Sequence, residues 1–217
     1  MAKTRRVQNN NIMSEIQKSE YIKTIVDMPW FYKPILDEIS KHSNNISSIL
    51  DVGCGNGFLL GLIHERYPHL SLKGIDIDVY FINKAREAFP FDFYVMDGYS
   101  FKQKGDLLIS NLALHHFEEP VKFIRNLIKN ANYGVIISDH IRPDEEKDLE
   151  ERLEKRQKFH DFSRSEYYKV RGRENILEAY SKEEMESLFK QIDIPGKLEF
   201  FNEDYFERFV IYFPTAN

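Results

Sequence analysis

The stretch Ile49-Leu50-Asp51-Val52-Gly53-Cys54-Gly55-Asn56-Gly57-Phe58-Leu59-Leu60 joins two apolar runs through a loop with glycine at every second position. The first run predicts a buried strand and the second predicts the start of a helix. Glycine adopts positive φ and leaves room for a ligand against the backbone. We therefore expect a ligand-binding turn between a strand and a helix. The alternative is a tight turn whose glycines serve packing alone.

Alternating strand and helix patterns continue on both sides of this loop. Five apolar runs predict strands at residues 46–52, 70–75, 91–96, 106–110 and 134–138. Helical patterns fall between them at residues 58–67, 79–89 and 120–129. Repeated units of this kind predict an α/β fold with a doubly wound, parallel sheet. Two further strand-like runs, at residues 198–201 and 206–213, are close enough in sequence to pair antiparallel.

The flanking segments have a different character. Residues 1–45 predict a polar tail followed by a helical cap, with helices at about 12–26 and 33–42. Residues 46–217 predict the main domain, interrupted by a charged, helical, lid-like insert at about 142–180 in which Pro143 opens a helix. Ser181 and Glu184 then have the spacing of a capping box.

Composition limits the classes of protein. A chain of 217 residues with 42% hydrophobic and 30% charged residues predicts one globular domain with appendages, and no apolar run is long enough to span a membrane. The single cysteine excludes an internal disulfide and a cysteine-based metal cluster, so we expect a cytoplasmic protein. The net charge of −5 makes nucleic acid an unlikely partner. The oligomeric state cannot be predicted from these features.

Three acids specify the ligand of the glycine loop. A dinucleotide fingerprint starting at Gly53 would require glycine where Phe58 stands, so that motif fails. Asp51, just before the loop, favours an ammonium or sulfonium group over a pyrophosphate. Asp76 ends the second predicted strand, where a carboxylate accepts hydrogen bonds from ribose hydroxyls. Asp97 follows the third strand and suits an exocyclic amine, with Met96 or Ile77 packed on the ring of the base. These requirements describe adenosine with a cationic tail.

Three segments of the chain resemble class I S-adenosylmethionine-dependent methyltransferases. Residues 49–57 resemble the first motif of that family, residues 74–88 the second and residues 106–117 the fourth. The resemblance covers roughly residues 46–213 and implies a Rossmann-like sheet of seven strands, mostly parallel, with the last strand antiparallel and helices on both faces. It also implies S-adenosylmethionine as cofactor, S-adenosylhomocysteine as product, and the following cofactor-binding residues: Asp51, Gly53, Cys54, Gly55, Gly57, Asp76, Ile77, Met96, Asp97, Gly98, Asn111 and Leu112.

Histidines are the candidates for catalysis. His116 is the first choice and His115 the second for a general base, because both follow the fourth strand and imidazole titrates near neutral pH. Either could instead cap a turn or pack against a neighbouring ring. His140 and Tyr32 are weaker candidates for binding the substrate. A metal site that includes Asp139 and His140 is conceivable but lacks a spaced third ligand, so we predict none.

The expected function is methyl transfer to an oxygen, nitrogen or carbon atom of a small molecule. The chain has Asn111-Leu112-Ala113-Leu114 where many amino-methyltransferases have a Pro-Pro-aromatic motif, which disfavours planar amines as acceptors. The alternative is a cofactor-binding protein of the same fold that transfers no methyl group, such as a scaffold or an enzyme that uses the sulfonium electrostatically. The aromatic run at residues 30–32 and the insert are candidates for a lid over the acceptor.

Overall fold

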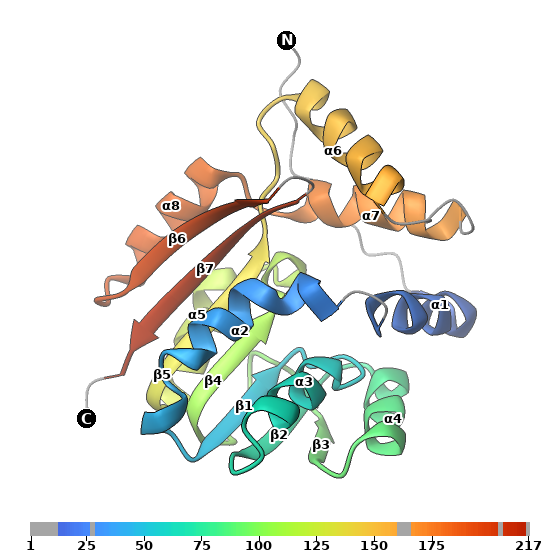
Figure 1. Ribbon diagram of the computed structural model, residues 1–217. Helices are drawn as coiled ribbons and strands as arrows, with labels where there is room; N and C mark the ends of the chain where they lie inside the picture. The colour runs from blue at the N-terminus through green and yellow to red at the C-terminus, as the bar shows by residue number, and fades with distance from the viewer. Residues whose placement is uncertain (1–12, 27–28, 160–165, 204–205, 216–217) are drawn as a thin grey trace.

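A seven-stranded sheet forms the centre of the molecule (Figure 1). The computed structural model describes residues 13–26, 29–159, 166–203 and 206–215. The strands lie in the order β3-β2-β1-β4-β5-β7-β6. Only β7 runs antiparallel to the others, since it pairs antiparallel with both β5 and β6. Their bounds are β1 (Ser48–Val52), β2 (Ser71–Asp76), β3 (Asp92–Val95), β4 (Gly105–Asn111), β5 (Ala131–His140), β6 (Lys197–Glu203) and β7 (Phe206–Pro214).

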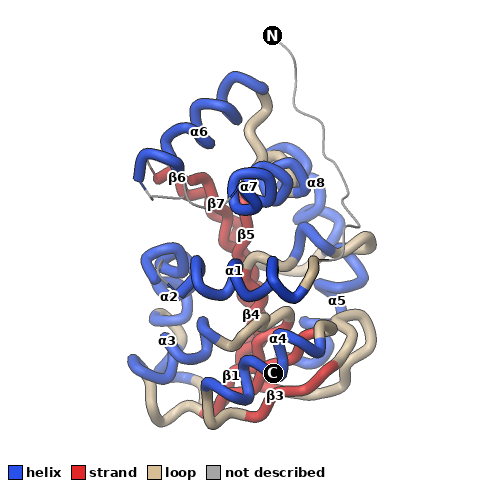
Figure 2. The backbone as a smooth tube through the Cα atoms, turned by 90° about the vertical axis from the view of Figure 1, so that its right-hand side faces the viewer, coloured by secondary structure: helices blue, strands red, loops and turns tan. Residues whose placement is uncertain are grey.

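Helices cover both faces of the sheet, as Figure 2 shows with the strands nearly edge-on. One apolar core lies between the sheet and α2, α3 and α4, and the other lies between the sheet and α5 and α8. The predicted doubly wound α/β fold with an antiparallel last strand is therefore confirmed. The helices are α1 (Glu15–Val26), α2 (Lys33–Ser40), α3 (Phe58–Arg66), α4 (Val79–Ala88), α5 (Pro120–Asn130), α6 (Glu146–Phe159), α7 (Glu166–Glu178) and α8 (Lys182–Ile192), with short 3₁₀ turns η1 (Pro29–Tyr32), η2 (Ser43–Asn45) and η3 (Leu114–His116).

The predicted elements differ from the observed ones chiefly at two places. β5 extends to His140 because its last residues pair with β7, whereas the apolar run alone predicted an end at residue 138. Pro143 does not open a helix, and α6 begins at Glu146 instead. The backbone amide of Arg142 donates to the carbonyl oxygen of Tyr180 at 2.9 Å, which holds the chain before Pro143 extended.

The order of the strands decides where a ligand can bind. β1 and β4 are neighbours, with β2 and β3 on one side and β5 on the other, so the chain reverses direction across the sheet at this point. Crevices beyond the carboxyl ends of strands at such a switch point are the usual ligand sites of open α/β sheets. In Figure 1 α1 and α7 lie at this end of the sheet. Within the described ranges, no helix has the length and apolarity needed to cross a membrane.

Candidate functional site

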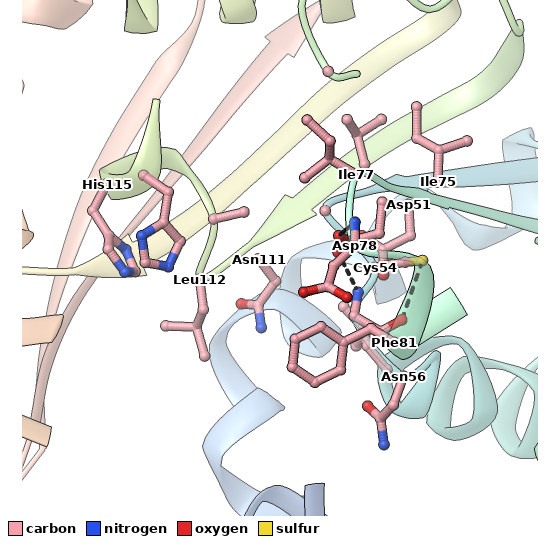
Figure 3. Close-up of a pocket in the computed structure, with 18 of the residues that line it drawn as sticks. Asp51, Cys54, Asn56, Ile75, Ile77, Asp78, Phe81, Asn111, Leu112 and His115 are labelled. Carbon is pink, nitrogen blue, oxygen red and sulfur yellow. Dashed lines mark hydrogen bonds between the residues drawn. The ribbon is translucent and has the colours of Figure 1, made fainter. Parts of the chain in front are cut away.

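A cavity of about 400 Å³ lies at the carboxyl ends of β1, β2 and β4. Figure 3 shows its wall, with Asp51 and Cys54 on one side and Leu112 and His115 on the other. The residues predicted above to bind the cofactor, to contact the acceptor or to act in catalysis all lie on this wall, except Gly57. That glycine packs away from it, since a Cβ there would lie 2.7 Å from the ring of Phe93.

The glycine loop follows β1 with three left-handed residues, Gly53, Gly55 and Gly57, at φ of +82°, +53° and +77°. A Cβ on Gly53 would lie 2.7 Å from the Cβ of Ala113, whereas a Cβ on Gly55 would meet no atom within 4 Å. The Gly53 amide donates to the carbonyl oxygen of Ile75 at 2.8 Å, which ties the loop to β2. Gly53 therefore serves the packing of the turn, while Gly55 leaves open space beside the cavity.

Asp76 links the glycine loop to the end of β2. Its Oδ2 accepts a hydrogen bond from the amide of Gly55 at 2.9 Å, and its Oδ1 accepts from the amide of Asp78 at 2.8 Å. Burial raises the pKa of Asp76, although these backbone hydrogen bonds act in the opposite direction. Each carboxylate oxygen can accept a second hydrogen bond. Asp76 thus supports the loop and still has capacity for a hydroxyl donor.

Asp51 is a buried acid at the base of the cavity. The residue is 2% exposed, and its Oδ1 has no hydrogen-bond partner among the described residues. Burial, together with the negative charge of Asp76, raises the pKa of Asp51 to about 8. A buried carboxylate is costly unless it is paired. The cavity therefore offers a ready partner to a ligand that carries a positive charge.

The rim beside β2 and β3 is apolar with one exposed acid. Ile77, which is 71% exposed, and Met96 both line the cavity. Asp97 is exposed, and its Oδ1 accepts from the amide of Tyr99 at 2.8 Å. An exposed isoleucine at the rim of a cavity provides a surface on which a flat ring can pack.

The end of β4 carries a strained residue. Leu112 has φ +58°, and its amide donates to the carbonyl oxygen of Ser138 at 2.8 Å. The Oδ1 of Asn111 accepts from Nη2 of Arg208 at 2.6 Å. A non-glycine residue in the left-handed region costs about 1–3 kcal/mol and is typical of functional sites. Because its Oδ1 is bonded to Arg208, the side chain of Asn111 is engaged inside the protein.

Arg208 was missed by the sequence analysis because it lies within the strand-like run at residues 206–213. Its side chain is fully buried, donates to the carbonyl oxygen of Phe31 at 3.1 Å and to Oγ of Ser138 at 2.8 Å, and lies 5.0 Å from the ring centroid of Phe31. It joins η1, β4, β5 and β7 behind the cavity.

His115 and Asp139 form a buried pair at the other side of the cavity. Nδ1 of His115 lies 2.8 Å from Oδ1 of Asp139, and the His115 amide donates to Oδ2 of the same carboxylate at 3.0 Å. The amide of His140 also donates to this group, at 2.7 Å. Burial opposes ionisation, but the charge and hydrogen bond of His115 outweigh it and lower the pKa of Asp139. Asp139 therefore fixes the orientation of the His115 ring.

His116 lies beside His115 and pairs with α7. The two ring centroids are 3.9 Å apart, and Nδ1 of His116 lies 3.1 Å from Oε2 of Glu178, whose side chain is 3% exposed. Desolvation around the ring and the adjacent His115 lower the pKa of His116. The sequence analysis did not single out Glu178, since it lies in a charged helix where most acids are solvated.

His140 and Tyr32 are buried residues of the cavity wall. The ring of His140 lies 5.4 Å from that of Phe31 between centroids, and the ring of Tyr32 packs edge-on against Phe58 at 5.6 Å. The carboxylate of Asp139 contacts Nδ1 of His115. Asp139 and His140 are therefore not the potential metal ligands that the fold brings together.

Two helices complete the wall with residues that the sequence did not indicate. α1 contributes Tyr21 and is held to the N-cap residue of α4 by an ion pair of 2.5 Å between Lys18 and Asp78. α7 contributes Asn175, whose buried Oδ1 has no partner in the described part of the chain. The insert therefore borders the cavity through α7. Residues 160–165 of the insert, part of the predicted lid, lie outside the described residues.

Comparison with known proteins places the chain in a family. A family model described as a methyltransferase domain matches residues 43–191. The chain belongs to this methyltransferase family. The resemblance of the three sequence motifs to those of methyltransferases is thereby confirmed.

Curated members of the methyltransferase family share part of the sequence. The malonyl-[acyl-carrier protein] O-methyltransferase of Acetivibrio thermocellus is 29% identical over 109 residues, 48% of this chain and 38% of that protein. The trans-aconitate 2-methyltransferase of Escherichia coli O1:K1 is 29% identical over 100 residues, 44% of this chain and 40% of that protein. The chain thus spans roughly two fifths of the length of these relatives.

Solved structures of methyltransferases share the fold. The plantazolicin methyltransferase BpumL, in complex with a pentazolic desmethylPZN analogue and SAH, superimposes with a TM-score of 0.65 at 17% identity, over 93% of this chain and 87% of that chain. Human N-acetylserotonin methyltransferase in complex with SAM gives a TM-score of 0.64 at 13% identity, over 94% of this chain and 57% of that chain. At these identities the likeness concerns the fold alone.

Proposed function

We propose that the protein transfers a methyl group from S-adenosylmethionine to an oxygen, nitrogen or carbon atom of a small molecule, leaving S-adenosylhomocysteine. The observation that carries the proposal is Asp51, a buried acid with an unpartnered oxygen beside the open backbone at Gly55. The ammonium group of the cofactor's methionyl part is the cation that this acid suits. Membership of the methyltransferase family supports the same assignment.

Each part of the cofactor has a matching group in the proposed arrangement. Asp51 pairs with the ammonium, and Asp76 uses its remaining lone pairs for the ribose hydroxyls. Ile77 and Met96 pack on the adenine, and Asp97 accepts from its amine. The backbone at residues 111–112 borders the methionyl end, because the side chain of Asn111 is engaged by Arg208.

The cofactor supplies an already activated methyl group on its sulfonium. The protein has to orient the acceptor, exclude water and receive a proton where the acceptor has one to lose. The candidate residues for the proton are His115 and His116, which the fold places together on the cavity wall with Asp139 and Glu178 behind them. His140 and Tyr32 are proposed to contact the acceptor. The names of the relatives, a malonyl-[acyl-carrier protein] O-methyltransferase and a trans-aconitate 2-methyltransferase, indicate which acceptors to test first.

Calorimetric titration with S-adenosylmethionine and S-adenosylhomocysteine tests the cofactor assignment. We expect the wild type to bind both and Asp51→Asn to bind at least about tenfold more weakly, because a charge-assisted contact is lost. Asp92→Asn, which changes an exposed acid outside the cavity, is the matched control. A wild type that binds neither compound contradicts the proposal.

Turnover separates an enzyme from a binding protein. We expect S-adenosylhomocysteine to accumulate when the protein is incubated with S-adenosylmethionine and a pool of small carboxylic acids and hydroxylated metabolites. Binding of the cofactor without turnover on any such pool would favour the scaffold alternative. A cytoplasmic location and the absence of a nucleic-acid partner remain part of the proposal.

A further inference from the structure

Three potential metal ligands meet at the acceptor side of the cavity. One ligand atom from each of His115, His116 and Glu178 lies within 4.8 Å of the others. The distance between Nδ1 of His116 and Oε2 of Glu178 is 3.1 Å. Ligand atoms that surround Zn²⁺ at about 2.0–2.2 Å in a tetrahedron lie roughly 3.4 Å apart. Shifts of at most about 1.4 Å in these distances would bring the three atoms to the spacing found around one ion.

We propose that His115, His116 and Glu178 bind one divalent transition-metal ion, with Zn²⁺ as the first candidate, and that the ion coordinates an oxygen of the methyl acceptor. The second half of this statement rests on the proposed methyltransferase function. The first half concerns the metal site and stands without it.

The donor set fits such an ion. Two imidazoles and one carboxylate form the three-ligand set of many catalytic zinc sites, which keep a fourth position open for water or substrate. Oxygen-only sites suit Mg²⁺ and Ca²⁺, whereas imidazole nitrogen selects for later transition metals. Methyl transfer involves no net oxidation, so a redox-inert ion is sufficient.

His115 is already oriented as metal-ligating histidines usually are. Its Nδ1 lies 2.8 Å from the buried carboxylate of Asp139, which leaves Nε2 as the nitrogen that can face an ion. A carboxylate–histidine–metal arrangement fixes the ring and strengthens the ligand. Asp139 is itself held by two backbone amides, those of His115 and His140, so it is anchored independently of the ion.

The local charge also favours a cation. Glu178 is the last residue of α7, and the carboxyl end of a helix carries a partial negative charge. Asp139 adds a second buried carboxylate behind His115. Arg208 offsets part of the charge of Asp139, so the negative charge that favours an ion of charge +2 is mainly that of Glu178 and the helix terminus beside His116.

The position of the site suggests what the ion does. His115 and His116 both belong to the cavity wall, so an open coordination position is accessible to a molecule in the cavity. A hydroxyl that coordinates a divalent ion loses its proton to solvent more readily. The resulting oxygen forms the new bond to the methyl carbon while the carbon–sulfur bond breaks, and the sulfur keeps that electron pair and becomes an uncharged thioether. The acceptor is thus narrowed to a molecule with a hydroxyl or carboxylate oxygen.

Metal binding can be measured without cofactor or acceptor. Protein freed of metal with a chelator is titrated with Zn²⁺ by calorimetry and with Co²⁺ by its visible absorption. We expect one ion per wild-type chain and at least about a tenfold loss of affinity in His116→Gln and in Glu178→Gln. His69→Gln and Glu186→Gln, which alter exposed residues of the same types elsewhere, are matched controls and should bind as the wild type does. Thermal melting shows that each variant is folded.

The possible results distinguish failure of the metal site from failure of the proposed methyltransferase function. No stoichiometric binding by the wild type, or binding that persists in both His116→Gln and Glu178→Gln, overturns the metal site. Full methyl transfer by chelator-treated protein overturns the second half of the proposal, the coordination of the acceptor by the ion, and then a histidine acts as the base. Binding of the ion by a protein that does not bind S-adenosylmethionine leaves the metal site standing and removes the proposed transferase function.

Discussion

The two ends of the cavity are built in different ways. Beside β1 and β2, contacts join residues close in sequence, such as Gly55 with Asp76 and Asp76 with Asp78. Beside β4 and β5, Arg208 connects Phe31, Asn111 and Ser138, which are 177, 97 and 70 residues away. The first end thus depends on a local motif, while the second depends on how distant segments assemble.

Removing Arg208 should give the largest effect. Arg208→Ala leaves three buried acceptors without their donor, so we expect the free energy of unfolding to fall by about 3 kcal/mol or more. Urea denaturation measures the change. Arg208→Lys should recover part of it, and Arg66→Ala, at an exposed arginine, should change little. A loss below about 1 kcal/mol in Arg208→Ala would mean that the end of the cavity beside β4 and β5 does not depend on this contact set.

Alanine substitutions in the glycine loop should destabilise the protein by different amounts at different positions. Gly53→Ala places a Cβ 2.7 Å from that of Ala113 at φ +82°, so we expect a loss of about 2 kcal/mol in thermal unfolding experiments. Gly55→Ala also places alanine at a positive φ, but its Cβ makes no close contact, so this variant should lose less stability. Gly172→Ala is the control, since that residue lies in helix α7 with open space around it and should become slightly more stable. Equal effects at Gly53 and Gly172 would contradict this division of roles.

The pH dependence of stability should reveal Asp51 in the cofactor-free protein. The folded state keeps a proton on Asp51 up to a pKa of about 8, while the unfolded state loses it near the ordinary value of 3.8. Because the folded state binds more protons between these values, Asp51 makes stability fall as pH rises, by up to about 1.4 kcal/mol per unit. Asp51→Asn should remove this contribution, so its unfolding free energy should rise relative to the wild type from pH 6 to 7.

Cofactor binding supplies the second half of this test. The ammonium group favours ionised Asp51, so binding at pH 7 should release a proton from the wild type and none from Asp51→Asn. Calorimetry in two buffers of different ionisation enthalpy measures the release. Equal proton release by the two proteins would show that Asp51 does not face the cation.

Loosening α1 should give the smallest effect. Lys18→Ala removes the ion pair with Asp78, so we expect less than about 1 kcal/mol of lost stability. Because α1 borders the cavity, dissociation of S-adenosylhomocysteine should become a few times faster in stopped-flow measurements. Lys33→Ala, which breaks an exposed pair with Asp37 on α2, should leave the dissociation rate unchanged.

Much of the fold could be predicted because its signals are local. The alternation of apolar runs and helical patterns gave the strand and helix order, and Ser181 forms the predicted capping box with Glu184, with hydrogen bonds of 2.8 and 3.2 Å. The observed bounds differ where pairing between distant strands extends an element, as at His140, or where a contact to Tyr180 delays one, as at Pro143.

The sequence by itself determined the glycine turn and the acids at the ends of the strands, because strand periodicity and the requirement for positive φ fix these positions within a short segment. Only the tertiary structure decided that Asp139 holds His115, that Glu178 comes beside His116, and that Arg208 is buried behind Asn111. These groups meet because parallel strands end at one edge and β7 returns between β5 and β6. A charged residue in a strand or helix has no local sign of such a partner, since the partner is supplied by the packing of remote segments.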